Sequence, residues 1–408
     1  MSSRPVRRRH VFYIPGYDPI HPRRYRELYR KEGAAQAAIS GYEINLRPQQ
    51  APGRYGWHVE ALIDGTQNRT DIETLIWSDI VRGSMDHGIA GSYALLFRTA
   101  WIYLSTGALF RLMRLRKGPV IAALYPVGFL LLQLVLAVGV GSVVVWAGKA
   151  ALIPVLGLVG HMIALAAGLA AAWGLLVWFK RQDSRFFTYY LLHNYAYSAQ
   201  HYGANPPELE TRMAEFTDEI AQAMTGEADE VLVVGHSSGA HLGISILADL
   251  IRQGGVPDSG PALSFLTLGQ VVPMVSFLPQ AHRLRADLQF LSSRDDIAWV
   301  DITAPGDGCA FALCDPVGVS GVATPAKRWP LVLSAAFTQT LSPERWKALR
   351  WRFFRLHFQY LCAFDRPGDY DYFQITAGPR TLADRFKGRA PSRSRIEAAV
   401  SSHRGVTP

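Results

Sequence analysis

The sequence predicts an α/β fold, with a mostly parallel sheet flanked by helices and a two-helix transmembrane hairpin inserted into it. Two observations support this prediction. Strand-like apolar runs alternate with amphipathic helical stretches over residues 10–64 and again over residues 207–378. Between these parts, residues 118–148 and residues 150–179 contain no charged side chain, and only Lys149 separates the two runs.

The first part begins with a strand and a turn in "HVFYIPGYDP", followed by a basic helical stretch. Residues 42–48 and 57–64 alternate as strands do, and residues 71–83, "DIETLIWSDIVRG", are predicted to form a short amphipathic helix. We therefore assign residues 1–92 to the N-terminal part of an α/β domain. The only apolar run near the start has five residues, too few for a signal peptide, so the N-terminus is expected in the cytoplasm.

The inserted region, residues 118–180, is predicted to span a membrane twice. Each uncharged run has about 30 residues, whereas a helix crosses a bilayer with about 20. With a break at Lys149, the two runs form a hairpin. Its outer ends are basic and its inner turn has a single lysine, so the positive-inside rule places both outer ends in the cytoplasm. The basic residues are Arg111, Arg114, Arg116 and Lys117 before the hairpin and Lys180, Arg181 and Arg185 after it, and Trp146, Trp173 and Trp178 lie near the span ends.

The segments beside the hairpin are also apolar. Arg98 and Arg111 leave too short an uncharged stretch to span a bilayer, so residues 93–117 are predicted to form an interfacial helix. The aromatic run at residues 186–202 fits either a second interfacial segment or a buried core segment equally well.

Residues 186–378 are assigned to the C-terminal part of the α/β domain. Helices are predicted at 207–225 and 238–252. Strands are predicted at 231–234, 263–269 and 298–303, within the stretches "VLVVGH", "LSFLTLG" and "IAWVDIT". Residues 379–408 are polar, basic and without apolar periodicity, which predicts a disordered tail.

The stretch "VLVVGHSSGAHLG", residues 231–243, contains the pattern G-x-S-x-G between a buried strand and a helix. This strand–turn–helix context predicts a nucleophile elbow with Ser237 as the nucleophile. Gly235 and Gly239 remove side chains that would clash across the turn, and His236 is the variable residue before the serine. A structural turn is the alternative interpretation of the same residues.

A nucleophilic serine needs a base, and the base needs an orienting acid. In elbow proteins the chain order is serine, acid, histidine. His241 lies on the elbow helix, His403 in the predicted tail, and His282 before the plausible acids, which leaves His357 as the candidate base. Asp307, in a glycine-flanked loop after a strand, is favoured as the acid over Asp301, which lies within that strand; Asp315 is a third choice.

An oxyanion hole requires two main-chain N–H donors near the nucleophile. The residue after the serine, Ser238, is predicted to supply one donor. The loop after the first strand, "YIPGYDP", is predicted to supply the other: Gly16 permits close approach of the backbone, and the amide of Tyr17 then points into the site. An ordinary tight turn is the alternative for this loop.

These residues together resemble the α/β-hydrolase superfamily. The elbow, the "FYIPGYDP" loop and the order Ser237, Asp307, His357 carry the resemblance, which covers residues 10–64 and 207–378. "FLTLGQVVPM" followed by "WVDITAPGDGCAF" looks like the acid-delivering segment of lipase-type members, although the strand ends in "LGQ" where lipases usually have "GSP". The resemblance implies an α/β-hydrolase sheet and a lipase- or esterase-like serine hydrolase.

The resulting expectation is a membrane-anchored hydrolase that cleaves acyl esters or thioesters of membrane lipids or acylated substrates at the cytoplasmic face of the inner membrane. An acyltransferase with the same three residues and a non-catalytic membrane scaffold on the same fold remain alternatives. The hairpin either shapes the substrate entrance or only anchors the chain. The sequence leaves the oligomeric state open.

The composition restricts other function classes. The net charge is +9, but no nucleic-acid recognition pattern accompanies it, so no nucleic-acid partner is expected. Only 18% of the residues are charged, against about 25% in typical soluble proteins, because of the apolar insert. No metal or organic cofactor is expected, since no Cys/His spacing suggests zinc and the three residues suffice chemically. The three cysteines, Cys309, Cys314 and Cys362, are expected to be reduced thiols.

Overall fold

The computed structural model describes residues 5–48 and 55–407. The chain forms two compact units: unit 1 contains residues 1–83, 106–119 and 201–408, and unit 2 contains residues 84–105 and 120–200. Residues 1–4, where the cytoplasmic N-terminus is predicted, lie outside the described residues.

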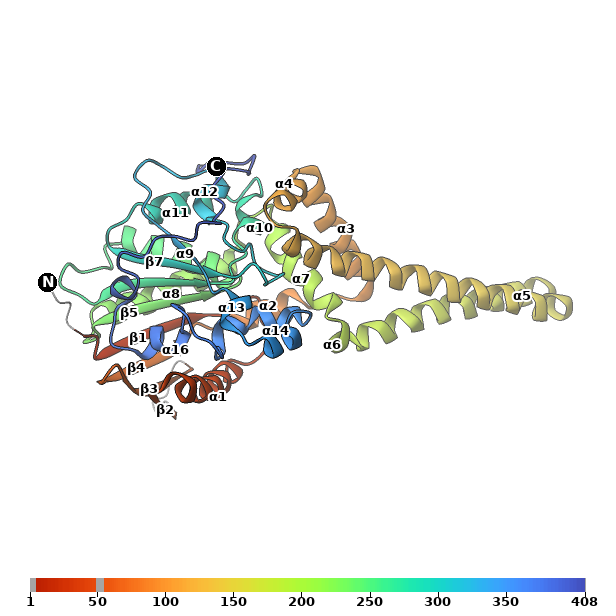
Figure 1. The fold of residues 1–408 in the computed structure, drawn as a ribbon. Coiled ribbons are helices and arrows are strands. Elements are labelled where there is room, and N and C mark those ends of the chain that lie inside the picture. The colour runs from red at the N-terminus through yellow and green to blue at the C-terminus, as the bar shows by residue number, and fades with distance from the viewer. Residues whose placement is uncertain (1–4, 49–54, 408) are drawn as a thin grey trace. The chain divides into compact units, whose positions relative to one another are not determined.

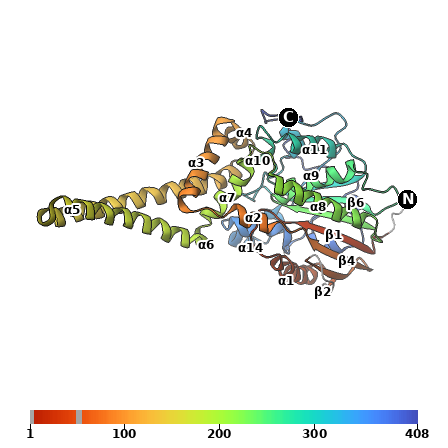
Figure 2. The same cartoon turned by 180° about the vertical axis from the view of Figure 1, so that it is seen from behind.

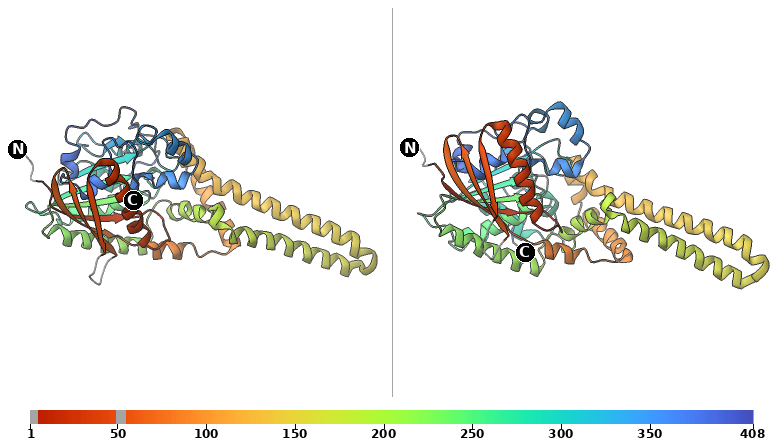
Figure 3. Two further views of the ribbon diagram at one scale, coloured as in Figure 1. Left: turned by 60° about the horizontal axis from the view of Figure 1, so that its bottom comes forward. Right: turned by 90° about the horizontal axis from the view of Figure 1, so that it is seen from below.

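Unit 1 is built on an eight-stranded sheet with the order β2-β3-β4-β1-β5-β6-β7-β8 (Figure 1). Strands β4, β1, β5, β6, β7 and β8 run parallel, while β2, β3 and β4 pair antiparallel at one edge (Figure 3). The predicted α/β fold with a mostly parallel sheet is therefore confirmed. The strands are Arg8–Ile14 (β1), Glu43–Pro48 (β2), Gly56–Ile63 (β3), Thr66–Thr74 (β4), Glu230–His236 (β5), Ala262–Leu268 (β6), Ile297–Thr303 (β7) and Leu331–Ser334 (β8).

Helices cover both faces of this sheet. The three helices α8, α9 and α11 pack together on one face (Figure 2). On the other face, α1, α16 and the segment 337–386 enclose a core rich in aromatic residues, including Tyr29, Tyr360 and Phe373. Because both faces are covered, the central strands are buried and mostly apolar; all seven residues of β5 are buried. The helices named here are Arg23–Ser40 (α1), Pro207–Met224 (α8), Gly239–Arg252 (α9), His282–Ser292 (α11) and Tyr372–Ala377 (α16).

Shorter helices complete unit 1. They are Ser78–Ser84 (α2), Ala108–Leu115 (α4), Pro273–Ser276 (α10), Pro316–Ser320 (α12), Phe337–Thr340 (α13), Pro343–Leu349 (α14), Phe353–His357 (α15), the 3-10 turn Gln359–Leu361 (η1) and Leu382–Arg385 (α17). The predicted helices at 207–225 and 238–252 are confirmed as α8 and α9.

The predicted helix at residues 71–83 is wrong over its first half. Strand β4 runs to Thr74 and pairs with both β1 and β3, and helix α2 begins only at Ser78. In the run "TDIET", buried residues also alternate with partly buried ones, as in a strand. Pairing on two sides outweighs the weak helical pattern, because the two neighbouring strands together satisfy the main-chain N–H and C=O groups of β4.

The predicted disordered tail, residues 379–408, is also wrong over the described residues. The Val6 N–H donates to the Pro379 carbonyl, and the Leu382 N–H donates to the buried carboxylate of Glu230 at the start of β5. Farther along, the Ile396 N–H donates to the Leu313 carbonyl and Arg285 donates to the Gly405 carbonyl. The tail is held to the rest of unit 1 by these hydrogen bonds and by Leu382 and Phe386, which are buried in the core, and its other residues are mostly polar.

Unit 2 is helical. Its helices are Ile89–Ser105 (α3), the larger part of Lys117–Arg181 (α5), Asp183–Phe186 (α6) and Thr188–Ala199 (α7). Helix α7 contains most of the aromatic run 186–202, and most of its residues are buried against α3 and α5, around Leu96, Leu130 and Leu192. Within the unit, the core interpretation of the aromatic run is the one that the packing supports.

The predicted two-helix hairpin with a break at Lys149 needs correction. The structure has one 65-residue element, α5, and Lys149 lies within it. The helical backbone is interrupted instead at Gly157, whose φ of 54° and ψ of −125° are non-helical. A Cβ atom at Gly141 would lie 2.8 Å from the Gly168 carbonyl oxygen, so the chain doubles back at this kink. Lysine is a good helix former, whereas glycine tolerates a positive φ, which explains the shifted turn.

Among the described residues, α5 is the one helix that is long and apolar enough to cross a membrane, by length and composition. Its most apolar window has a mean hydropathy of 2.4, and 22% of that window is buried within the protein. The predicted interfacial helix at 93–117 is not one helix either: α3 and α4 divide it, and they belong to different units. Gly107, with a φ of 69°, lies between them.

Candidate active site

The turn between β5 and α9 has the geometry of a nucleophile elbow. Ser237 has a φ of 56°, in the left-handed region that a residue with a Cβ rarely adopts. A Cβ at Gly235 would lie 2.7 Å from the Gly239 carbonyl oxygen, and one at Gly239 would lie 2.1 Å from the Ile14 carbonyl oxygen. Both glycines are therefore required for the tight turn, as the sequence predicts.

The same close packing continues into α9. A Cβ at Gly243 would meet the ring of Phe265 on β6 at 2.7 Å, so this helix lies directly on the sheet. The Ser237 N–H donates to the Leu268 carbonyl at the end of β6, with an N–O distance of 2.9 Å. This bond fixes the turn at the carboxyl edge of the parallel strands, where ligand sites of open α/β sheets form.

The loop after β1 approaches the serine from the other side. A Cβ at Gly16 would lie 3.0 Å from the Ser237 Cβ and 3.5 Å from its Oγ, so only a small residue fits beside the hydroxyl. The indole of Trp77 donates to the Pro15 carbonyl, and the Tyr17 ring packs edge-on against Trp77, with ring centroids 6.1 Å apart. The predicted approach of Gly16 to the serine is thus present in the structure.

The Ser238 N–H is available at the start of α9. It donates to no residue that the structure describes, whereas Ala240 already bonds back to the Ser237 carbonyl. The first N–H groups of a helix have no partners within the helix and lie at the positive end of its dipole. An oxygen that gains negative charge near Ser237 would be stabilised here.

Asp307 and His357 meet although 50 residues separate them. The His357 Nδ1 and the Asp307 Oδ2 are 2.7 Å apart, and both side chains are buried. Two other donors hold the carboxylate: the Tyr360 hydroxyl bonds to Oδ2 at 3.0 Å and the Cys309 N–H bonds to Oδ1 at 2.9 Å. An ionised carboxylate only accepts hydrogen bonds, so Nδ1 carries the imidazole proton and Nε2 keeps its lone pair.

The histidine is tied to the elbow through its main chain. The His236 Nε2 donates to the His357 carbonyl oxygen at 3.0 Å, and the two imidazole rings are 4.8 Å apart. A Cβ at Gly269, directly after β6, would lie 3.0 Å from the His357 Cε1. His357 therefore lies over the end of β6, next to the turn that holds Ser237.

Burial keeps the supporting groups neutral. Burial, and then the nearby His357, lowers the pKa of His236 to about 3, so His236 remains an uncharged donor. Burial raises the pKa of the Tyr360 hydroxyl, and the Asp307 charge raises it further, so Tyr360 stays protonated and donates. Tyr360 is not among the site residues predicted from the sequence; its position three residues after His357 is the signal that could have identified it.

The two other candidate acids have different partners. Asp301 lies inside β7, where its Oδ1 accepts from the Thr267 hydroxyl at 2.6 Å. Asp315 caps α12 by accepting from the Val317 and Gly318 N–H groups, and it pairs with Lys327. Of the three aspartates, Asp307 alone contacts His357 among the described hydrogen bonds and ion pairs.

Asp301 predicts a specific pH dependence of stability. Burial raises its pKa to about 8, despite the Thr267 hydrogen bond, and Asp315 raises it further. Between about pH 4 and about pH 8 the unfolded chain loses this proton while the folded chain keeps it, so this group's contribution to stability falls as pH rises, by up to about 1.4 kcal/mol per pH unit. Asp301→Asn removes that slope. Thermal unfolding at pH 6 and pH 8 should therefore show a smaller loss for Asp301→Asn than for the unmodified chain; equal losses would contradict it.

One cluster of potential metal ligands overlaps this site. Ligand atoms of Asp307, Cys309 and His357 all lie within 4.8 Å of one another. The Nδ1 of His357 is already bonded to the carboxylate, and burial, followed by the Asp307 charge, raises the pKa of the Cys309 thiol. Because the Asp307 carboxylate and the His357 Nδ1 already bond to each other, the arrangement favours acid–base chemistry over metal binding.

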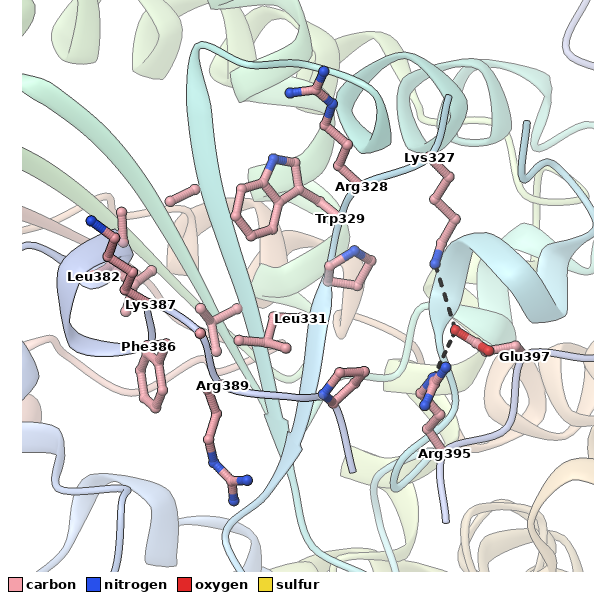
Figure 4. Close-up of a pocket in the computed structure, with 16 residues that line it drawn as sticks. Lys327, Arg328, Trp329, Leu331, Leu382, Phe386, Lys387, Arg389, Arg395 and Glu397 are labelled. Carbon is pink, nitrogen blue, oxygen red and sulfur yellow. Dashed lines mark ion pairs between the residues drawn. The ribbon is translucent and has the colours of Figure 1, made fainter. Parts of the chain in front are cut away.

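A separate cavity of about 440 Å³ lies at the β7–β8 edge (Figure 4). It is lined by residues of the two strands, of the segment 327–330 before β8 and of the segment 382–397, and by none of Ser237, Asp307 and His357. Its charged lining is mainly cationic, with Glu397 as the one acidic residue, which pairs with Arg395 and with Lys327 (Figure 4), and no serine, histidine or aspartate lines it. The cavity is therefore not part of the candidate active site.

The structure thus brings together the elbow glycines, Gly16, His236 and the His357–Asp307 pair at the carboxyl ends of β1, β5, β6 and β7. Comparison of the chain with protein-family models, with curated proteins and with solved structures found no match. A proposal for the function of this protein therefore rests on the geometry of these side chains.

Proposed function

We propose that this protein is a membrane-anchored serine hydrolase that cleaves acyl esters or thioesters. The observation that carries the proposal is the combination of a strained serine at a strand–helix turn with a buried histidine–aspartate pair beside the same turn. Strained backbone is costly and persists where the surroundings enforce it, which is frequent at active sites. Ser237, His357 and Asp307 are the proposed catalytic residues.

In the proposed mechanism, the Ser237 Oγ attacks the substrate carbonyl carbon while the His357 Nε2 takes the hydroxyl proton. Asp307 stabilises the imidazolium that forms, and Tyr360 and the Cys309 N–H hold the carboxylate in place. The N–H groups of Ser238 and Tyr17 are the proposed oxyanion donors. The imidazolium then protonates the leaving alcohol or thiol, and a water activated by His357 releases the acyl group from the serine.

Membrane anchoring through α5 is the second element of the proposal. Its 65 residues, its high mean hydropathy and its kink at Gly157 suit a segment that enters and leaves one side of a bilayer. Lys117, Lys180 and Arg181 at its two ends favour the cytoplasmic side for both, and therefore for unit 1. A carbonyl at a membrane surface belongs most often to a lipid or an acylated protein, so these are the proposed substrates.

Labelling with a fluorophosphonate tests the chemistry. The full chain in detergent should react covalently with the probe, and Ser237→Ala should lose labelling by about 10³-fold or more, because the nucleophile is gone. Ser238→Ala is the matched control: it removes the neighbouring hydroxyl but keeps the main-chain N–H, and it should retain labelling. Equal labelling of the unmodified chain and Ser237→Ala would rule out the assignment. No labelling of either would favour a non-catalytic scaffold.

A further inference from the structure

We infer that the segment Pro343–His357 is a docking surface for an anionic lipid bilayer, adjacent to the proposed active site. This inference rests on the membrane anchoring proposed above and extends it to unit 1. Three observations on the described residues support it: exposed aromatic rings, unpaired cations, and packing against both the acid loop and the first residues of α5.

The segment exposes large aromatic side chains in an otherwise polar setting. Trp351 is 73% exposed and Phe353 is 49% exposed, and both lie between α14 and the start of α15. Their rings are 6.5 Å apart and form one apolar patch. Tryptophan and phenylalanine at such exposure are typical of surfaces that enter the headgroup region of a bilayer.

Cations surround these rings. Lys347, Arg350, Arg352 and Arg355 are all exposed, and none of them forms an ion pair with a residue that the structure describes. Arg345, by contrast, pairs with Asp365 and Glu32. Glu344 is the only acidic residue of the segment. The surface therefore has a local excess of positive charge around an apolar centre, which complements anionic lipid headgroups.

The packing of Gly308 places this surface near the membrane entry of the chain. A Cβ at Gly308 would touch the Phe353 ring at 3.2 Å, and a Cβ at Gly118 would lie 3.2 Å from Gly308 itself. Arg116, just before α5, donates to the Ala312 carbonyl at 2.7 Å and fixes this junction on unit 1. The uncharged run of α5 begins at Gly118, so within unit 1 the surface lies beside the residue at which the apolar insert begins.

The same contacts link the surface to the site. Gly308 follows Asp307 directly, and the Trp346 ring would lie 2.6 Å from a Cβ at Gly306, on the other side of that aspartate. The segment then ends at His357. A bilayer on this surface would thus bring a lipid ester close to the proposed nucleophile without crossing solvent.

The test places a fluorophore at residue 351 through Trp351→Cys in the full chain reconstituted into vesicles. The matched control is Ile39→Cys on α1, which is exposed to 45% and lies outside the surface. In vesicles of phosphatidylglycerol and phosphatidylcholine, quenching by lipid-attached nitroxide should be about twofold or more stronger at 351 than at 39, with weaker quenching by aqueous iodide. Charge reversal at Arg350, Arg352 and Arg355 should bring position 351 to the level of position 39, as should vesicles of phosphatidylcholine alone.

Each outcome has one meaning. If the chains float with the vesicles but iodide quenches position 351 as strongly as position 39, the docking surface is overturned while membrane anchoring stands. Protection from iodide without lipid quenching shows that another molecule covers the surface, and also overturns it. Failure of the chain to float overturns membrane anchoring and the inference together. Fluorophosphonate labelling of Ser237 in the same samples reports the hydrolase proposal independently.

Discussion

Asp307→Asn is expected to lower the rate of fluorophosphonate labelling by about 10³- to 10⁴-fold, because the asparagine favours the wrong imidazole tautomer. In the structure the Asp307 Oδ2 accepts from the His357 Nδ1, which leaves the Nε2 lone pair for the serine proton. An amide nitrogen at that position would donate instead and push the proton to Nε2. Labelling rates measured over time in the full chain give the effect directly.

Asp301→Asn is the matched control for this prediction. It makes the same chemical change in the same sheet region, but Asp301 bonds to Thr267 inside β7 and not to His357. Its labelling rate should stay near that of the unmodified chain. If Asp301→Asn slows labelling as strongly as Asp307→Asn while its thermal unfolding midpoint stays near that of the unmodified chain, the assignment of the orienting acid is incorrect.

Gly239→Ala is expected to destabilise the fold by about 3 kcal/mol or more. The new Cβ would lie 2.1 Å from the Ile14 carbonyl oxygen and 2.8 Å from the Pro15 carbonyl oxygen. Ile14 pairs with Gly235 of β5 and the Pro15 carbonyl accepts from the Trp77 indole, so neither main-chain atom can move aside cheaply. The change would be measured as a lowered midpoint of thermal or denaturant unfolding.

Gly83→Ala serves as the comparison for the glycine prediction. A Cβ at Gly83, on α2, would meet nothing within 4 Å, and its backbone has no positive φ. Alanine there should alter stability by no more than about 1 kcal/mol, in the stabilising direction because of its helix propensity. A Gly239→Ala variant as stable as Gly83→Ala would show that the elbow is looser than these distances imply.

Local sequence patterns predicted those elements whose buried and exposed residues follow the apolar periodicity of their own segment. The buried run before Ser237 and the helix after it follow from residues that are neighbours in the chain, and both are present as β5 and α9. The candidate histidine was selected by chain order alone, yet it lies beside the elbow. Chain order was informative because the parallel strands present their carboxyl ends at one edge.

The errors occurred where distant parts of the chain decide the structure. Strand β4 is stabilised by two partners that the local pattern does not reveal, and the tail after Pro379 is held by main-chain bonds to β5, to the loop before α12 and to α11. The turn of α5 depends on which residue tolerates a positive φ, and glycine at 157 does so where lysine at 149 does not. None of these features produces a regular spacing of apolar residues within its own segment that would have predicted it.

The amino-acid order alone specified the strained serine, the glycines around it and the apolar insert, because each depends on residues within a few positions of one another. Only the tertiary structure decided between Asp307 and Asp301 as the partner of His357, and only it revealed Tyr360 and His236 as supports. Those contacts span 50 to 121 residues and depend on strand order and loop closure. Such choices are made by packing geometry, which no local pattern encodes.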